Sequence, residues 1–386
     1  MNYSSGGYYQ PPENDNNSYG SFPGKQGGFH FGPRIPHFVP HQVWLTEKNN
    51  IKKLSIFAAI SVLAYIIGSG IFVAVFQGLF SFLSELKGFD YSVFQLKWNS
   101  AEFQYLFEVL YSVLIVGGPF FLLGFLFRKK GVVADIPLNK PQNLKNIPLI
   151  ILGGFGLCLA GNIITSYINV VFSAISGIEL KMPEMPETPH NAGGILLFYL
   201  STAVIPALIE EMALRGIIMQ PLRRYGDLFA IIASAAVFGL MHCNLMQIPF
   251  AFLAGIVIGF AVIVTESVWT GVIIHFLNNA FTVTVTIIED FYGLESVQYK
   301  VINLVFYAVI TAGCISAFLF LRYKNKKTLY KSPLVNYGNG FIGVVPPFSA
   351  KISNGTLLKA YFITLPMIVA FGAVVYETIM AIILLQ

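Results

Sequence analysis

Two adjacent glutamates and an arginine, Glu210, Glu211 and Arg215, lie in a segment that is otherwise apolar. A charged side chain at membrane depth costs at least ~2.5 kcal/mol, so it is retained where it faces a protein interior or a wet cavity. Glu211 and Arg215 are spaced i, i+4 and can form an ion pair on one helix. Glu210 is then left without a local partner and is a candidate general base. The alternative is that all three form one structural charge network at a helix end.

Two further apolar segments each carry one histidine. His242 follows Phe238 by one helical turn, and His275 precedes Asn279 by one turn. His275 and Asn279 therefore share a helix face, whereas Asn278 lies off that face and is the weaker candidate. A lone histidine or amide in an apolar helix can also serve only to hydrogen-bond neighbouring helices together.

Depth in the membrane separates these two interpretations. At a rise of ~1.5 Å per residue from the end of each segment, Glu210, His242, His275 and Asn279 fall in one layer. A carboxylate and an imidazole in one layer can deprotonate a water molecule or hold a metal ion. A second histidine and an amide can stabilise the oxyanion of a tetrahedral intermediate. The spacing therefore favours a site that activates water.

The composition indicates the kind of scaffold that positions these residues. The chain has 386 residues, of which 55% are hydrophobic and only 11% are charged, whereas soluble domains carry about 25% charged residues. The fold class predicted is all-α, a polytopic membrane helical bundle of about eight to nine transmembrane helices. The polar start of the chain has no apolar region typical of a cleavable signal peptide. The three cysteines form neither a disulfide framework nor a CxxC metal motif.

Nine apolar segments approach the roughly 20 residues that a membrane span needs. The fifth and sixth are short and closely linked, so they can also form a hairpin that does not fully cross. The candidate segments are 54–80, 103–127, 147–173, 194–219, 228–243, 248–264, 268–288, 300–321 and 361–385.

Basic residues cluster in alternate loops, which predicts the orientation. With nine crossings, all of the basic clusters fall on one side, and such clusters mark the cytoplasmic face. The clusters comprise Lys48, Lys52, Lys53, Arg128, Lys129, Lys130, Lys140, Lys145, Arg223, Arg224, Arg322, Lys324, Lys326, Lys327 and Lys331. We therefore expect a multi-pass protein of the cell membrane with a cytoplasmic N-terminus. On this topology Glu108 and Glu377 lie nearer the outer side, away from the layer that holds the site.

The three motifs together resemble those of a known family. Glu210-Glu211-x-x-x-Arg215, Phe238-x-x-x-His242 and His275-x-x-x-Asn279 occur in this order on separate segments. They resemble the motifs of the CPBP family, the CAAX prenyl endopeptidases and bacteriocin-processing or immunity proteins, also called Abi. The resemblance covers about residues 190–290. With the low-complexity start of the chain and the apolar segments outside the resemblance, four regions are predicted: a disordered cytoplasmic tail (1–50), N-terminal transmembrane helices (51–190), a CPBP-type catalytic core (191–290) and C-terminal transmembrane helices (291–386).

The resemblance implies an intramembrane endopeptidase, described for the family either as a metalloprotease or as a glutamate endopeptidase. Residues matching Glu210 and His242 would activate the water, and those matching His275 and Asn279 would lie at the oxyanion or the metal. Glu211, Arg215 and Phe238 look like supporting residues. The implied substrate is a membrane-anchored protein or peptide, prenylated or small, among membrane lipids; we expect no nucleic-acid partner.

Zinc is the cofactor to be tested. Glu210, His242 and His275 would make a three-ligand zinc site with an open fourth position. If Glu210 were a ligand, it would not be free to act as the base, so the two roles are alternatives. Two other functions stay open: a non-catalytic immunity or scaffold protein, and a proton-coupled transporter. The intact motifs argue against the first, and the lack of internal repeats argues against the second.

Overall fold

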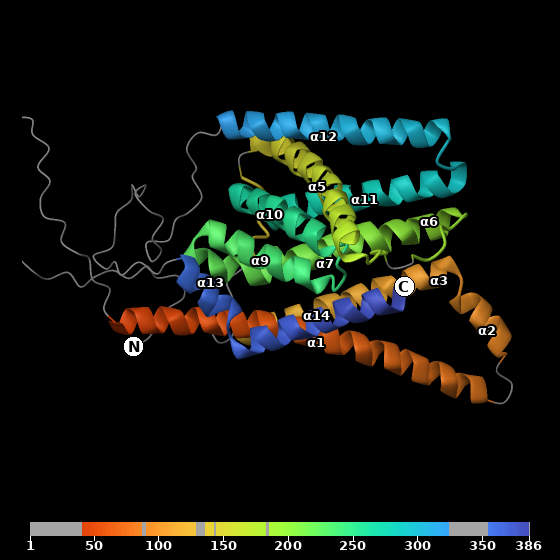
Figure 1. Ribbon diagram of the computed structural model, residues 1–386, viewed down its shortest axis with the longest axis horizontal. Helices are drawn as coiled ribbons and strands as arrows, with labels where there is room; N and C mark the ends of the chain where they lie inside the picture. Colours follow the sequence, from red (N-terminus) through yellow and green to blue (C-terminus); the bar gives the residue numbers. More distant parts are fainter. Residues whose placement is uncertain are drawn as a thin grey trace, which may run out of the picture. The chain divides into compact units, whose positions relative to one another are not determined.

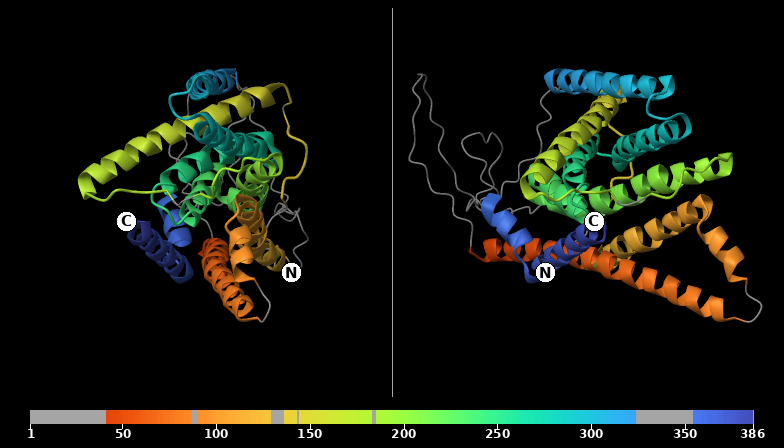
Figure 2. Two further views of the ribbon diagram at one scale, coloured as in Figure 1. Left: turned by 90° about the vertical axis from the view of Figure 1, so that its right-hand side faces the viewer. Right: turned by 45° about the vertical axis from the view of Figure 1, so that its right-hand side comes forward.

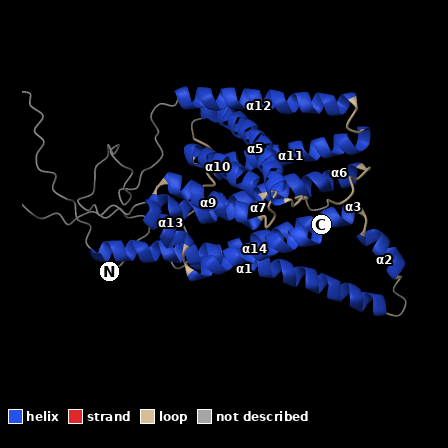
Figure 3. Cartoon of the chain, in the orientation of Figure 1, coloured by secondary structure: helices blue, strands red, loops and turns tan. Residues whose placement is uncertain are grey.

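The computed structural model describes residues 41–86, 90–128, 136–142, 144–182, 185–323 and 354–385. Within these ranges every regular element is helical (Figure 3), which confirms the all-α prediction. Residues 1–40 of the predicted tail lie outside the described residues. The last ten residues of that tail differ from the prediction, because helix α1 already begins at His41.

Figure 1 shows the order of the helices along the chain. The α-helices are α1 (His41–Glu85), α2 (Tyr91–Trp98), α3 (Ala101–Tyr111), α4 (Gly118–Arg128), α5 (Ile147–Ser176), α6 (Ala192–Tyr199), α7 (Ile205–Glu211), α8 (Met219–Leu222), α9 (Asp227–Met241), α10 (Ile248–Thr265), α11 (Val268–Tyr292), α12 (Val297–Tyr323), α13 (Asn354–Phe362) and α14 (Leu365–Leu385). The π-helical turns are η1 (Ser112–Gly117), η3 (Leu200–Val204) and η4 (Met212–Ile218), and the 3₁₀ turns are η2 (Leu144–Asn146) and η5 (Arg223–Tyr225).

Eight helices in the described part of the chain are long and apolar enough to cross a membrane. The protein is therefore a multi-pass membrane protein, and the predicted number of eight to nine spans is confirmed. The remaining candidate, the fifth apolar segment (228–243), forms α9, which has 15 residues. At 1.5 Å per residue it is about 22 Å long, shorter than the roughly 30 Å hydrocarbon layer.

Close backbone packing joins α5 to α12. A Cβ atom added to Gly156 would lie 2.7 Å from the Cα atom of Gly313, so glycine at these positions lets the two helices touch. Beyond this contact α5 also packs against α10 and α11 (Figure 2). The helix α5 thus holds the outer helix α12 against the elements that carry the site.

The two ends of the membrane domain also pack together. The helix α1 lies against α13 and α14, and Figure 2 shows α14 beside α1. The hydroxyl groups of Ser55 and Thr364 lie 2.7 Å apart and form a buried hydrogen bond between these segments. The first and last spans also both pack against α9, and α1 packs against α8.

The fourth span, Ala192–Tyr225, is helical throughout but irregular. Its α7 segment, which carries both glutamates, lies between the π-helical turns η3 and η4. Within α7, Pro206 has no N–H, so the carbonyl of Thr202 loses its α-helical donor. Single π-helical turns inside α-helices are frequent at functional sites, and here they flank the predicted catalytic residues.

Candidate active site

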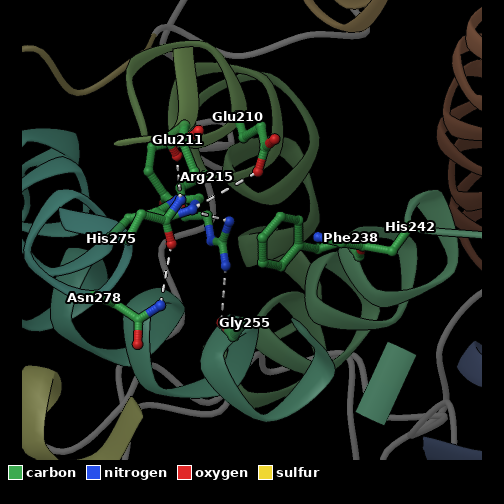
Figure 4. A network of polar contacts seen from close by, with 10 residues as sticks. Glu210, Glu211, Arg215, Phe238, His242, Gly255, His275 and Asn278 are labelled. Carbon is green, nitrogen blue, oxygen red and sulfur yellow. Dashed lines mark hydrogen bonds and ion pairs between the residues drawn. The ribbon is translucent and has the colours of Figure 1, made fainter. Parts of the chain in front are cut away.

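The helices α7 and α11 bring Glu210 and His275 together (Figure 4). His275 Nε2 lies 3.9 Å from Glu210 Oε2. This distance is too long for a direct hydrogen bond, but one water molecule can lie within reach of both atoms. The Glu210 side chain is 19% exposed and that of His275 is 8% exposed. The predicted proximity of these two segments at one depth is therefore present in the structure.

A buried charge network, formed by Glu211, Arg215 and the inner edge of His275, lies behind this pair. Glu211 Oε1 accepts a hydrogen bond of 2.9 Å from the Arg215 guanidinium, and both side chains are fully buried. The same oxygen lies 2.9 Å from His275 Nδ1. The i, i+4 pair expected from the sequence is confirmed, whereas the contact with His275 was not expected. Because a carboxylate only accepts, Nδ1 carries the hydrogen and the Nε2 atom of His275 is directed to Glu210.

Packing fixes this network from two further sides. The Arg215 guanidinium lies 4.6 Å from the centre of the Phe238 ring, a cation–π distance, and donates to the carbonyl of Gly255 at 3.4 Å. A Cβ atom at Gly271 would lie 2.7 Å from Val262 and 3.0 Å from Glu211 Oε2. Glycine at position 271 therefore lets α11 approach the network closely enough for His275 to reach it.

The second histidine, His242, lies at the end of α9 and across the Phe238 ring from His275 (Figure 4). The ring centres of Phe238 and His242 are 5.0 Å apart, and those of Phe238 and His275 are 5.9 Å apart. His242 Nδ1 lies 2.9 Å from the carbonyl oxygen of Phe238. This contact places the hydrogen on Nδ1, since a carbonyl only accepts, and leaves Nε2 as the acceptor.

The three side chains expected to bind zinc do not meet as a ligand set. The Phe238 ring lies between the rings of His242 and His275 and separates them. No group of three or more His, Cys, Asp or Glu side chains in the described ranges is placed to hold a metal ion. This arrangement of donors does not fit a site with three protein ligands around one ion.

The paired asparagines of α11 form a directed chain of hydrogen bonds. Asn279 Nδ2 donates to the Thr202 carbonyl at 3.0 Å, and Asn278 Nδ2 donates to Asn279 Oδ1 at 3.1 Å. The Thr202 carbonyl is the one that Pro206 leaves without its α-helical donor. One amide hydrogen of Asn279 is thus committed to the fold, and the second stays available. The sequence pattern had ranked Asn278 lower because it lies off the His275 face, yet it orients Asn279.

A cavity of about 610 Å³ opens in front of these groups. Its walls include Glu210, His242, His275 and Asn279, whereas Glu211 and Arg215 are buried behind it. Such a volume lies in the range of sites that bind small organic groups or short peptide segments. The cavity therefore collects the four predicted catalytic side chains in one space, without placing all of them in mutual contact.

The expectation for Glu108 was wrong. This residue was assigned to the outer side of its span, away from the site, but it lines the same cavity. The rise per residue gives the position of Glu108 along its own helix. It does not show how far the cavity extends between the helices. Its signal in the sequence is that of an ionisable residue within an apolar span, which by itself is a reason to expect a functional role.

Comparison with known protein families gives one match. Residues 192–281 match the family described as type II CAAX prenyl endopeptidase Rce1-like. No curated protein and no solved structure matches the chain. The matched range begins at α6 and ends in α11, so it contains the three motifs and most of the walls around Glu210 and His275. Residues 192–281 of the chain are therefore similar to the Rce1-like type II CAAX prenyl endopeptidases.

Proposed function

We propose that this protein is an intramembrane endopeptidase in which Glu210 and the two histidines activate a water molecule. The observation that carries the proposal is the placement of Glu210 on the cavity wall, 3.9 Å from a histidine whose other nitrogen is held by a buried carboxylate. The match of residues 192–281 to the Rce1-like type II CAAX prenyl endopeptidases supports this activity. The roles of individual residues below are our proposal.

In the first step, a water molecule between Glu210 and His275 attacks the carbonyl carbon of the scissile peptide bond. Glu210 accepts a proton from this water as a new carbon–oxygen bond forms. His275 orients the water, since Glu211 fixes the direction of its ring. The Nε2 atom of His242, which its contact with the Phe238 carbonyl leaves as an acceptor, assists from the other side of the cavity.

In the second step, the negatively charged oxygen of the tetrahedral intermediate is stabilised by hydrogen-bond donors. The second amide hydrogen of Asn279 supplies one of them, because only its first is used on Thr202. The carbon–nitrogen bond then breaks, and protonated Glu210 returns its proton to the leaving amine. Glu210 ends the cycle as a carboxylate, so the protons balance without a metal ion.

The substrate we propose is a membrane-anchored protein or peptide, prenylated or small. Much of the cavity wall is apolar, which suits hydrophobic side chains close to the scissile bond. The apolar residues include Phe198, Phe250, Ala251, Ala254 and Ile258. We further propose a cell-membrane location with the N-terminus in the cytoplasm, on the basis of the basic loops.

The test is to replace Glu210→Gln, which removes the charge and keeps the shape. The matched control is Glu377→Gln, because Glu377 is also a carboxylate in a membrane span but does not line the cavity. Purified variants in lipid vesicles are given membrane-anchored peptides, and new N-termini are identified by mass spectrometry. We expect cleavage by the wild type and the control, and a loss of about 10²–10⁴-fold in the Glu210→Gln variant.

Three results would contradict the proposal. Cleavage at the wild-type rate by Glu210→Gln would remove Glu210 from the chemistry. In cells, a biological effect that is retained by Glu210→Gln but lost on deletion of the chain would favour a scaffold or immunity role. A proton-coupled flux that disappears in the variant would favour transport.

A further inference from the structure

Glu108 is a carboxylic acid in the membrane that the proposed mechanism does not use. It lies on α3, in the span Ala101–Arg128, and it lines the catalytic cavity. Acidic residues inside membrane spans are rare because of their cost, and they face water or a partner where they occur. The presence of Glu108 on the cavity wall therefore calls for a role in what the cavity binds.

The carboxyl group of Glu108 is only partly satisfied within the protein. The hydroxyl of Ser201 lies within its reach, but the same hydroxyl also contacts the carbonyl of Phe198 at 3.3 Å. A hydroxyl donates one hydrogen bond, whereas a carboxylate has about four acceptor sites. Among the described residues, no salt bridge involves Glu108 and no lysine or arginine lines the cavity. Acceptor capacity is thus left on the cavity side, with no cation of the protein to use it.

The helix α3, which carries Glu108, packs against the π-helical turn η3 of the fourth span. Ser201 is followed by Thr202, whose carbonyl holds the Asn279 amide. The Asn279 end of the cavity wall is therefore also the end near Glu108. A peptide whose scissile bond lies at Glu210 and His275 would pass Glu108 once it extends beyond Asn279.

We infer that Glu108 is a specificity-determining residue, which binds a cationic side chain of the peptide near the scissile bond. This inference rests on the proposed function. The two carboxylates of the cavity wall, Glu108 and Glu210, face no basic side chain of the lining except the histidines. A lysine or arginine in the peptide would supply the missing counter-charge, while an acidic residue would meet repulsion.

The test uses membrane-anchored peptides in which lysine replaces leucine at each position around the scissile bond in turn. For the wild type we expect one position where lysine raises kcat/KM about tenfold, as a charge-assisted hydrogen bond allows. Glu108→Gln abolishes this preference, so the ratio of kcat/KM for the lysine peptide to that for the leucine peptide falls to about one. Glu108→Lys reverses it and favours a peptide with glutamate at the same position. The control Glu377→Gln keeps the wild-type preference.

Binding separates this inference from the mechanism. Lysine and leucine peptides are also titrated by fluorescence anisotropy onto Glu210→Gln, with and without Glu108→Gln. Tighter binding of the lysine peptide that vanishes only when Glu108 is replaced supports the inference even if no cleavage by the wild type is found. Equal loss for lysine and leucine peptides would assign Glu108 a purely structural role. No preference at any position in the wild type would equally overturn the inference.

Discussion

Glu210 and Glu211 are neighbours in sequence, yet they belong to two different regions of the molecule. The Glu210 side chain is 19% exposed on the cavity wall, and that of Glu211 is fully buried behind it. Successive residues of a helix point about 100° apart, so one turn of α7 serves both regions. The partners of the two side chains therefore distinguish the carboxylate that we propose as catalytic from the structural one, although their residue types are the same.

The buried network is rigid because each of its members has several contacts. Glu211 Oε1 binds both Arg215 and His275, and Arg215 is also held by Phe238 and Gly255. Among the described residues, the one ion pair of Glu210 on the cavity wall is its 3.9 Å approach to His275. Substitutions in the network should therefore change stability first, and those on the wall should change activity first.

The largest effect on stability is expected from splitting the buried ion pair. Glu211→Gln and Arg215→Gln should each lower the free energy of unfolding by about 3–5 kcal/mol, since each leaves one buried charge without its partner. The measurement is denaturant-induced unfolding in mixed micelles. The double variant should lose less than the sum of the two single variants. Single variants as stable as Glu210→Gln would abolish the distinction between network and wall.

A smaller effect is expected from narrowing the approach of α11. Gly271→Ala adds a methyl group in contact with Val262 and Glu211, and should cost about 1–3 kcal/mol of stability. The matched control is Gly70→Ala on α1, where nothing lies within 4 Å of the added atom. That control should be neutral or gain up to about 1 kcal/mol. Equal effects of both substitutions in thermal unfolding would show that the close approach at Gly271 is unimportant.

The smallest effect is expected from removing metal ions. Because the donors around Glu210 do not fit a three-ligand zinc site, cleavage should continue unchanged in the presence of a chelator. Purified protein should likewise contain no stoichiometric zinc by elemental analysis. Zinc at one ion per chain that is lost in both His242→Ala and His275→Ala would contradict this, and would make the wall a metal site.

Local spacing made part of the site predictable from the sequence. The Glu211–Arg215 pair depends only on the i, i+4 geometry of one helix, and the structure contains it. The lengths of the apolar segments likewise predicted the eight spans, and the short fifth segment became α9, an apolar helix shorter than a span. Each of these features is decided within a single helix, where the rise and turn per residue are known.

The rest depends on how the helices are rotated about their axes. Depth alone placed Glu210, His242 and His275 in one layer, but it did not show that Phe238 stands between His242 and the other two. It also gave no sign that His275 would turn its Nδ1 atom to Glu211. For Glu108, depth pointed away from the site although the cavity reaches it. Rotation is set by packing between helices, which a single helix pattern does not contain.

The π-helical turns around α7 have a consequence for insertions and deletions. A π-helical turn accommodates about one residue more than an α-helical turn. Deleting one residue from Met212–Ile218 would remove this extra residue and leave a regular α-helix, so the residues after it would keep nearly the same faces. The same deletion in a regular α-helical turn would rotate everything after it by about 100°. Single-residue gaps in alignments of related chains should therefore be tolerated within this turn and not in the α-helical segments beside it.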